Sequence, residues 1–201
     1  MILIIDYGMG NLGSVYNALC KLQHDCQISG DPNKVIKASR VILPGVGAFE
    51  DAMKNLREKG LDDAVREVAA RDVPLLGICL GMQLFCDESE ENGLHQGLSL
   101  VPGRVARFRL PNRFKVPHMG WNDILPVLGS RLFAGVAPSS YFYFVHSYHV
   151  NLGDNQWAGA SCNYGYDFVC ALEHRNLFAT QFHPEKSGEV GLKVLNNFAR
   201  L

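Results

Sequence analysis

Short apolar runs alternate with helix-like stretches through the first half of the chain, and this alternation constrains the fold more than any other feature. Runs that are apolar throughout, rather than at every second position, indicate parallel strands buried on both faces of a sheet. The predicted strands are Ile2–Asp6, Cys26–Ser29, Val41–Leu43 and Leu75–Ile78. This order predicts a doubly wound, flavodoxin-like α/β sheet, which binds ligands beyond the carboxyl ends of its strands.

Helical periodicity fills the segments between these strands. Apolar side chains recur at helical spacing from Leu12 to Leu22, directly after Asn11, a suitable N-cap. A longer amphipathic stretch runs from Phe49 to Arg71, and Gly60 is a plausible break in it. A further helix is expected from Cys79 through Phe85.

The second half of the chain is rich in strand-like segments. They are Leu100–Phe108, Trp121–Leu125, Tyr141–Val150, Trp157–Cys162, Phe168–Glu173 and Leu177–Phe182. We interpret them as antiparallel additions that make the sheet mixed, followed by a closing helix from Ser187 to Ala199. No linker rich in serine or proline and no repeat divides the sequence, so residues 1–201 are expected to form one domain.

Composition excludes several classes of function. With 19 basic and 20 acidic residues the net charge is −1, which argues against nucleic-acid or membrane binding. The N-terminus lacks a charged leader region, and no segment reaches the roughly 20 apolar residues of a membrane span. Six cysteines without a Cys-x-x-Cys pair indicate reduced thiols in a cytoplasmic protein. No metal-binding spacing is present, so neither a metal nor another cofactor is expected.

The segment from Gly77 to Gln83 carries the strongest functional signal. Cys79 falls between a predicted strand and a helix, with glycines two residues before and two residues after it. This arrangement is typical of a nucleophile elbow, in which a tight turn lifts the reactive atom clear of the sheet. A following helix N-terminus favours the thiolate, and the N–H of Leu80 can stabilise an oxyanion.

A candidate base lies near the C-terminus. His183 and Glu185 are two residues apart after a strand-like run, and Pro184 favours extended backbone at His183, so both side chains can project together. The carboxylate can then hold the imidazole in one tautomer. His146 is the strongest rival base, although no carboxylate stands beside it in the sequence.

The turn from Pro44 to Phe49 follows the third predicted strand and could lie beside Cys79. Glycines on both sides of Val46 leave the peptides of Val46 and Gly47 approachable, which suits a second oxyanion donor. An ordinary tight turn is the simpler reading of this segment alone.

Together, these three segments resemble the class I, or triad, glutamine amidotransferases. Four others are similar to the glutaminase subunits of imidazole glycerol phosphate synthases, and the likeness spans essentially the whole chain. They are Asp6–Leu12, His118–Asn122, Tyr143–Tyr148 and His183–Gly188.

The resemblance implies a subunit that releases ammonia from glutamine for a (β/α)8-barrel cyclase of histidine biosynthesis. The cyclase passes the ammonia through a channel and makes imidazole glycerol phosphate and aminoimidazole carboxamide ribotide. By resemblance, the residues that bind glutamine are Gln83, Glu91, Ser147 and Tyr148. Those at or near the cyclase interface are Asn11, Trp121, Tyr143 and Lys186. The glutaminase is also expected to be nearly silent until the cyclase binds its own ligand.

Three alternatives remain at this stage. The chain could be the glutaminase of another synthase, such as that for pyridoxal phosphate or anthranilate. It could be a free-standing cysteine hydrolase of γ-glutamyl bonds, which would turn over efficiently alone. It could also be a non-catalytic α/β binding module, in which Cys79 would not react with an electrophilic glutamine analogue.

Overall fold

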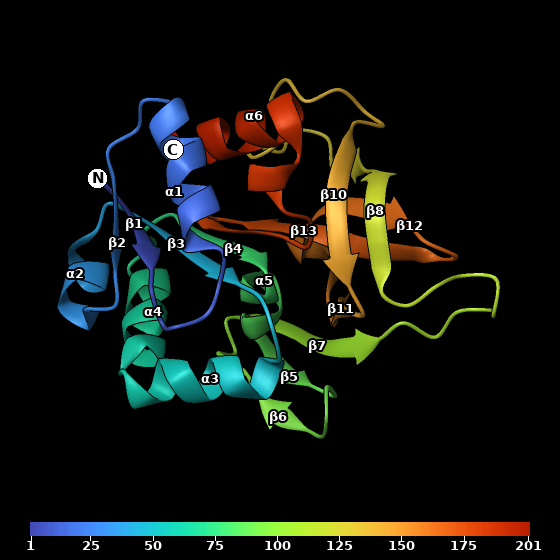
Figure 1. Cartoon of the computed structure of the whole chain (residues 1–201), viewed down its shortest axis with the longest axis horizontal. Helices are drawn as coiled ribbons and strands as arrows, with labels where there is room; N and C mark the ends of the chain where they lie inside the picture. The colour runs from blue at the N-terminus through green and yellow to red at the C-terminus, as the bar shows by residue number, and fades with distance from the viewer.

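Five parallel strands form one end of the main sheet, in the order β2-β1-β3-β4-β14, and Figure 1 labels the first four. The computed structural model describes all residues from 1 to 201. The strands are β1 (Ile2–Ile5), β2 (Cys26–Ser29), β3 (Arg40–Gly45), β4 (Leu75–Cys79) and β14 (Leu177–Thr180). The predicted flavodoxin-like order is confirmed, with β14 in the fifth position.

Helices cover both faces of these strands. On one face lie α1 (Leu12–Lys21) and α6 (Gly188–Ala199). On the other lie α2 (Pro32–Lys37), α3 (Phe49–Glu58), α4 (Leu61–Ala70) and α5 (Leu80–Leu84). The predicted break at Gly60 is confirmed, since this residue adopts a left-handed conformation between α3 and α4.

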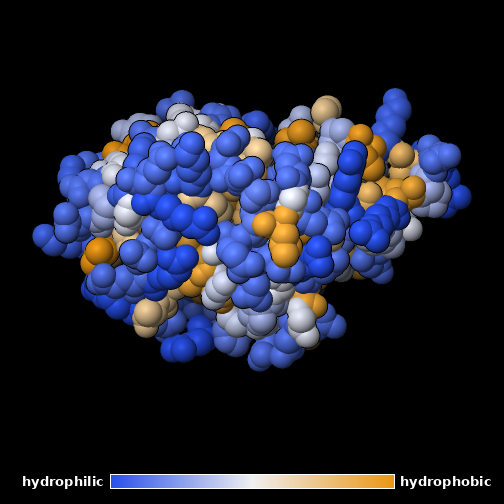
Figure 2. All heavy atoms as spheres, turned by 90° about the horizontal axis from the view of Figure 1, so that it is seen from below, coloured by the Kyte–Doolittle hydropathy of each residue, from blue (hydrophilic) through white to orange (hydrophobic).

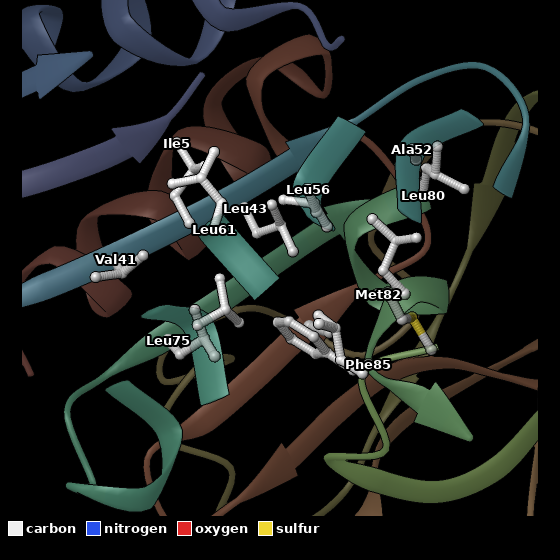
Figure 3. Close-up of a cluster of buried hydrophobic side chains, with 14 of the residues drawn as sticks. Ile5, Val41, Leu43, Ala52, Leu56, Leu61, Leu75, Leu80, Met82 and Phe85 are labelled. Carbon is white, nitrogen blue, oxygen red and sulfur yellow. The ribbon is translucent and has the colours of Figure 1, made fainter. Parts of the chain in front are cut away.

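Alternate residues of β1, β3, β4 and β14 enter two separate hydrophobic cores. Ile5 and Leu43 face α3 and α4, whereas Ile4 and Ile42 face α1 and α6. Figure 3 shows the first core, where strand side chains meet those of α3, α4 and α5, with Leu80 at one side next to Ala52. Fully burying one such side chain is worth about 1.5–3 kcal/mol. This packing fixes the backbone directly after Cys79.

The remaining strands extend the sheet along the path β14-β13-β11-β7-β5-β6, with β12 paired to β13 and β9 paired to β12. They are β5 (Cys86–Ser89), β6 (His95–Gln96), β7 (Val101–Arg107), β9 (Leu125–Pro126), β11 (Tyr148–Leu152), β12 (Ala158–Asn163) and β13 (Asp167–His174). Two 3-10 helices occur, η1 (Asn155–Trp157) and η2 (Pro184–Lys186). A separate two-stranded antiparallel sheet, the β8–β10 sheet, pairs β8 (His118–Asp123) with β10 (Tyr141–His146).

Most of the second-half strands are antiparallel as predicted, but three of the predictions were wrong. The predicted strand Trp121–Leu125 covers the end of β8 and the start of β9, which belong to different sheets. The strand at Leu177–Phe182 ends at Thr180 and runs parallel to β4, because it completes the doubly wound core. The run Tyr141–Val150 is two strands, β10 and β11, which separate at Ser147 and belong to different sheets. A continuous series of β-forming residues contains no signal for such a change of sheet.

Three short elements were not predicted from the sequence. Helix α2 has six residues, a proline in its first turn and an N-cap at Asp31. Strands β5 and β6 are also short, and β5 runs parallel to β7. Elements of this length carry too few residues for a hydrophobic period to appear.

The surface is mixed in character, with separate hydrophobic groups among hydrophilic ones on the face in Figure 2. Large exposed apolar side chains concentrate on the β8–β10 sheet, at Met119, Trp121 and Tyr141. No helix has both the length and the apolar character that crossing a lipid bilayer requires.

Candidate active site

The carboxyl ends of β3, β4 and β14 bring three distant parts of the sequence together. Gly45 pairs with Cys79, and Thr180 pairs with Ile78, so the chain leaves all three strands at one edge. Val46 follows the first strand, Cys79 ends the second, and His183 follows the third within three residues. The predicted proximity of the turn at Pro44–Phe49 to Cys79 is confirmed.

Cys79 sits on a strained turn between β4 and α5. Its φ is 56° and its ψ is −109°, in a region that non-glycine residues rarely adopt. The flanking glycines are needed because the backbones approach closely. A Cβ on Gly81 would overlap the carbonyl oxygen of Leu43, and one on Gly77 would lie 2.8 Å from the carbonyl oxygen of Gly81. The spacing of the elbow therefore has a steric origin.

His183 and Glu185 form a buried pair. Nδ1 of His183 lies 2.9 Å from Oε1 of Glu185, and the two side chains are 2% and 1% exposed. A carboxylate only accepts hydrogen bonds, so it holds a proton on Nδ1 and leaves Nε2 for another partner. Nε2 is buried and has no hydrogen-bond partner within the protein.

The backbone of β10 holds this pair in place. The N–H of His183 donates to the carbonyl of Tyr143 at 3.0 Å. The hydroxyl of Ser187 donates to the carbonyl of His183 at 2.6 Å and accepts from the N–H of Tyr143 at 3.0 Å. The position of the imidazole therefore depends on the β8–β10 sheet.

The charge state of His183 reflects its neighbours. Burial lowers the pKa of the imidazole, but the side chains of Cys79 and Glu185 outweigh burial and raise it from 6.5 to about 10. The raised pKa favours the charged ring, the form that pairs with a thiolate.

A pocket of about 350 Å³ opens at this edge of the sheet. It is lined by Val46, Gly47, Cys79, Leu80, Gln83, Glu91, Pro117, Val145, His146, Ser147, Tyr148 and His183. These lining residues include all those predicted for the nucleophile, the base, the oxyanion site and glutamine binding. Only Glu185, the predicted orienting carboxylate, does not line the pocket, but it contacts His183, which does.

Backbone donors are available in this pocket. Neither the N–H of Val46 nor that of Gly47 donates a hydrogen bond to any group of the protein. Val46 is 40% exposed, and Gly47 has a φ of 99°. The turn thus has two N–H groups without a partner in the protein, on residues that line the same pocket as Cys79.

The sequence of the chain matches the family model of class-I glutamine amidotransferases over residues 3–201. The chain belongs to this family. It is 52% identical over 200 residues to the imidazole glycerol phosphate synthase subunit HisH of Moorella thermoacetica, covering 100% of this chain and 94% of that protein. It is 48% identical to the HisH of Sulfurimonas denitrificans, over 100% of this chain and 98% of that one. At these identities and coverages, the chain belongs to the HisH group of the amidotransferase family.

Solved structures agree on the fold. A crystal structure of a glutamine amidotransferase superposes with a TM-score of 0.77 at 19% identity and covers 100% of both chains. PurLQS from Thermotoga maritima also gives 0.77, at 17% identity, covering 99% of this chain and 97% of the other. The class I amidotransferase fold expected from the sequence is therefore confirmed.

His146, the rival base, is engaged elsewhere in this amidotransferase. Its Nδ1 lies 2.8 Å from the carbonyl oxygen of Tyr148, and its Nε2 lies 3.0 Å from Nδ1 of His118. Burial lowers its pKa to about 3. With both ring nitrogens occupied, His146 has no free lone pair with which to accept a proton from Cys79.

Gln181 is a buried residue that touches Cys79 and was not predicted from the sequence. Its amide nitrogen lies 3.8 Å from Sγ of Cys79, and its amide oxygen accepts from Nε2 of Gln83 at 3.0 Å. Gln83 also donates to the carbonyl of Tyr148 at 3.1 Å, while Glu91 accepts from the N–H of Phe49 at 2.8 Å. The available signal was an amide side chain two residues after the apolar run Leu177–Ala179.

The four residues predicted for the partner interface lie in two places. Trp121 and Tyr143 are directly opposite on the β8–β10 sheet, with ring centroids 6.1 Å apart, and Trp121 is 56% exposed. Asn11 caps α1, and Lys186 is exposed on η2, which packs against α1.

Proposed function

We propose that this chain is the glutaminase subunit of an imidazole glycerol phosphate synthase and that Cys79, His183 and Glu185 form its catalytic triad. The observation that carries the proposal is the common pocket of Cys79 and the His183–Glu185 pair, on a chain about half identical to HisH proteins. The proposed domain is residues 1–201, since one sheet contains strands from both halves of the sequence.

The proposed reaction is acyl transfer through a thioester. The thiolate of Cys79 attacks the side-chain amide carbon of glutamine, and the carbonyl oxygen becomes an oxyanion. The N–H groups of Leu80 and of Val46 or Gly47 are the proposed oxyanion donors, each worth about 2.7–4 kcal/mol in such sites. His183 donates its Nε2 proton to the leaving nitrogen, and ammonia departs.

Hydrolysis of the thioester completes the proposed cycle. The neutral Nε2 of His183 accepts a proton from water, the hydroxide adds to the thioester carbon, and Cys79 leaves as a thiolate. Glutamate is released and the imidazolium is restored. The role of Glu185 is to keep a proton on Nδ1 and to stabilise the charged ring.

Four lining residues are proposed to hold the amino acid part of glutamine. Glu91 offers a carboxylate and Gln83 an amide oxygen, and both can accept hydrogen bonds from the ammonium group of the substrate, because the amide hydrogens of Gln83 are already donated to Tyr148 and Gln181. The backbone at Ser147 and Tyr148, where β10 ends and β11 begins, is the proposed contact for the carboxylate.

The HisH relatives are named as subunits of a synthase, which supports a partner for this chain. We propose a cytoplasmic heterodimer with a (β/α)8-barrel cyclase that receives the ammonia through a channel. The exposed apolar face of the β8–β10 sheet, together with Asn11 and Lys186, is the proposed contact surface. Apolar aromatic residues of this kind are enriched at protein interfaces.

Measuring glutamine hydrolysis with and without the cyclase tests this proposal. We expect slow release of glutamate by the free chain, and an increase when the cyclase and its ribonucleotide ligand are both added. Efficient hydrolysis by the chain alone, unchanged by the cyclase, would instead favour a free-standing hydrolase of γ-glutamyl bonds. Stimulation only by the synthase of another pathway would reassign the partner.

A further inference from the structure

A line of hydrogen bonds, buried at its centre and partly buried at its ends, leads from the β8–β10 sheet to the wall of the pocket. Nδ2 of Asn122 lies 3.2 Å from Nε2 of His118. Nδ1 of His118 lies 3.0 Å from Nε2 of His146, and Nδ1 of His146 lies 2.8 Å from the carbonyl oxygen of Tyr148. His118 and His146, which we call the histidine pair, are not part of the proposed reaction.

The chemistry of the two ends fixes every proton along this line. The carbonyl of Tyr148 can only accept, so Nδ1 of His146 carries a hydrogen and its Nε2, in the neutral ring, must accept. Nδ1 of His118 is then the donor to His146, and Nε2 of His118 accepts from the amide of Asn122. The other hydrogen of that amide is donated to the carbonyl of Asn163 at 2.9 Å.

Both rings are neutral at neutral pH. Burial lowers the pKa of His118 to about 4 and that of His146 to about 3. Each bond in the line therefore holds one proton, and a ring flip or a change of tautomer would leave two donors or two acceptors facing each other. An unsatisfied buried polar group costs about 1–3 kcal/mol.

Packing prevents such rearrangements. The ring of His118 stacks between Phe144 and Tyr164, with centroid distances of 4.7 and 4.0 Å. His146 is flanked by Phe108 at 5.1 Å and Phe168 at 5.4 Å. The line is thus rigid from β8 to β11.

The carbonyl at its end belongs to the pocket. Tyr148 begins β11 directly after Ser147, where the chain passes from one sheet to the other, and both residues line the pocket. The same carbonyl accepts a second hydrogen bond from Nε2 of Gln83 at 3.1 Å. Two donors on one oxygen define the orientation of the peptide that follows Tyr148.

We propose that His118 is a positioning residue for glutamine, because its proton sets the tautomer of His146, which holds the Tyr148 carbonyl and the adjoining pocket wall. The inference rests on the proposed function, since it assumes that glutamine binds beside Ser147 and Tyr148. The residue it adds to the proposed glutamine site, His118, lies on β8 and does not line the pocket.

Two substitutions of His118 separate positioning from packing. His118→Phe keeps the stacked ring but removes the donor, whereas His118→Asn loses the ring but keeps an N–H where Nδ1 stood. In the complex with the cyclase, we expect the KM for glutamine to rise about 10-fold in His118→Phe, with kcat within about 3-fold, as expected for a lost buried hydrogen bond. His118→Asn should lie within about 3-fold of the wild-type KM. If His118 served only for packing, the KM for glutamine would instead rise more in His118→Asn than in His118→Phe.

His149 provides the matched control. It is buried in the same aromatic cluster, with its ring centroid 4.7 Å from that of Phe108, and its Nε2 lies 2.8 Å from the hydroxyl of Tyr166, away from the pocket wall. His149→Phe should therefore leave the KM for glutamine unchanged. If the KM for glutamine rose as much in His149→Phe as in His118→Phe, loss of any buried imidazole in this cluster would have the same effect. That result would overturn the proposal.

Nitrogen NMR shifts of the imidazoles give a readout that packing does not affect. In the free chain at pH 7, we expect His118 and His146 both to be neutral with the hydrogen on Nδ1. The opposite tautomer in either ring, or an unchanged KM in His118→Phe, would overturn the proposal while leaving glutamine hydrolysis intact. Absence of hydrolysis by the wild-type complex would instead overturn the proposed function and this inference together.

Discussion

Replacing Cys79 with alanine should abolish glutamine-dependent synthesis by the complex while ammonia-dependent synthesis survives. The sulfur is the only proposed nucleophile, and removal of a nucleophile from a catalytic triad costs about 10⁴-fold or more in kcat. Synthesis from ammonium salt should persist because the cyclase chemistry needs ammonia and not this thiol. The measurement is product formation with glutamine or with ammonium as nitrogen source.

Cys86 offers a control for this experiment. It is also a buried cysteine, but it lies on β5 within the hydrophobic core and outside the pocket. Cys86→Ala is expected to retain glutamine-dependent synthesis at a temperature where the protein remains folded. If Cys79→Ala hydrolysed glutamine at the wild-type rate, another residue would have to be the nucleophile.

Replacing His183 with alanine should reduce glutamine hydrolysis nearly as much as loss of the thiol. His183 both donates the proton to ammonia and activates water, so neither half of the reaction proceeds well without it. Glu185→Gln should lower kcat about 10²-fold less than His183→Ala does, because the amide oxygen of the new glutamine can still accept a hydrogen bond from Nδ1. The measurement is kcat for glutamate release in the presence of the cyclase and its ligand.

His174 is the control for the substitution of His183. It lies at the end of β13 and stacks on Trp157 with a centroid distance of 4.2 Å, outside the pocket. His174→Ala should hydrolyse glutamine at the wild-type rate. If His183→Ala and Glu185→Gln both hydrolysed glutamine at the wild-type rate, neither residue could have the proposed catalytic role.

The sequence was sufficient to predict the proposed site because each part has a local signature. The glycines around Cys79 are required by backbone contacts that a Cβ would prevent, so the elbow is visible as a motif. His183 and Glu185 are two residues apart and bond directly. The parallel order of the strands then brings both segments to one edge, as doubly wound topology requires.

Features that depend on pairing between distant segments could not be predicted in this way. His118 and His146 are 28 residues apart and meet only because β8 and β10 pair in register at these positions. Gln181 reaches Cys79 because β14 pairs in parallel with β4, whereas the segment Leu177–Phe182 was predicted to be an antiparallel addition. Ser147 looks like the middle of a strand, although the chain changes sheets there.

Labelling with an electrophilic glutamine analogue tests the central claim most directly. The complex is treated with the analogue, digested, and mapped by mass spectrometry, and the remaining cysteines among the six serve as internal controls. The account predicts a single adduct on Cys79 that free glutamine suppresses and that His183→Ala slows. An adduct on a different cysteine, or an unlabelled Cys79 in a complex that hydrolyses glutamine, would contradict it.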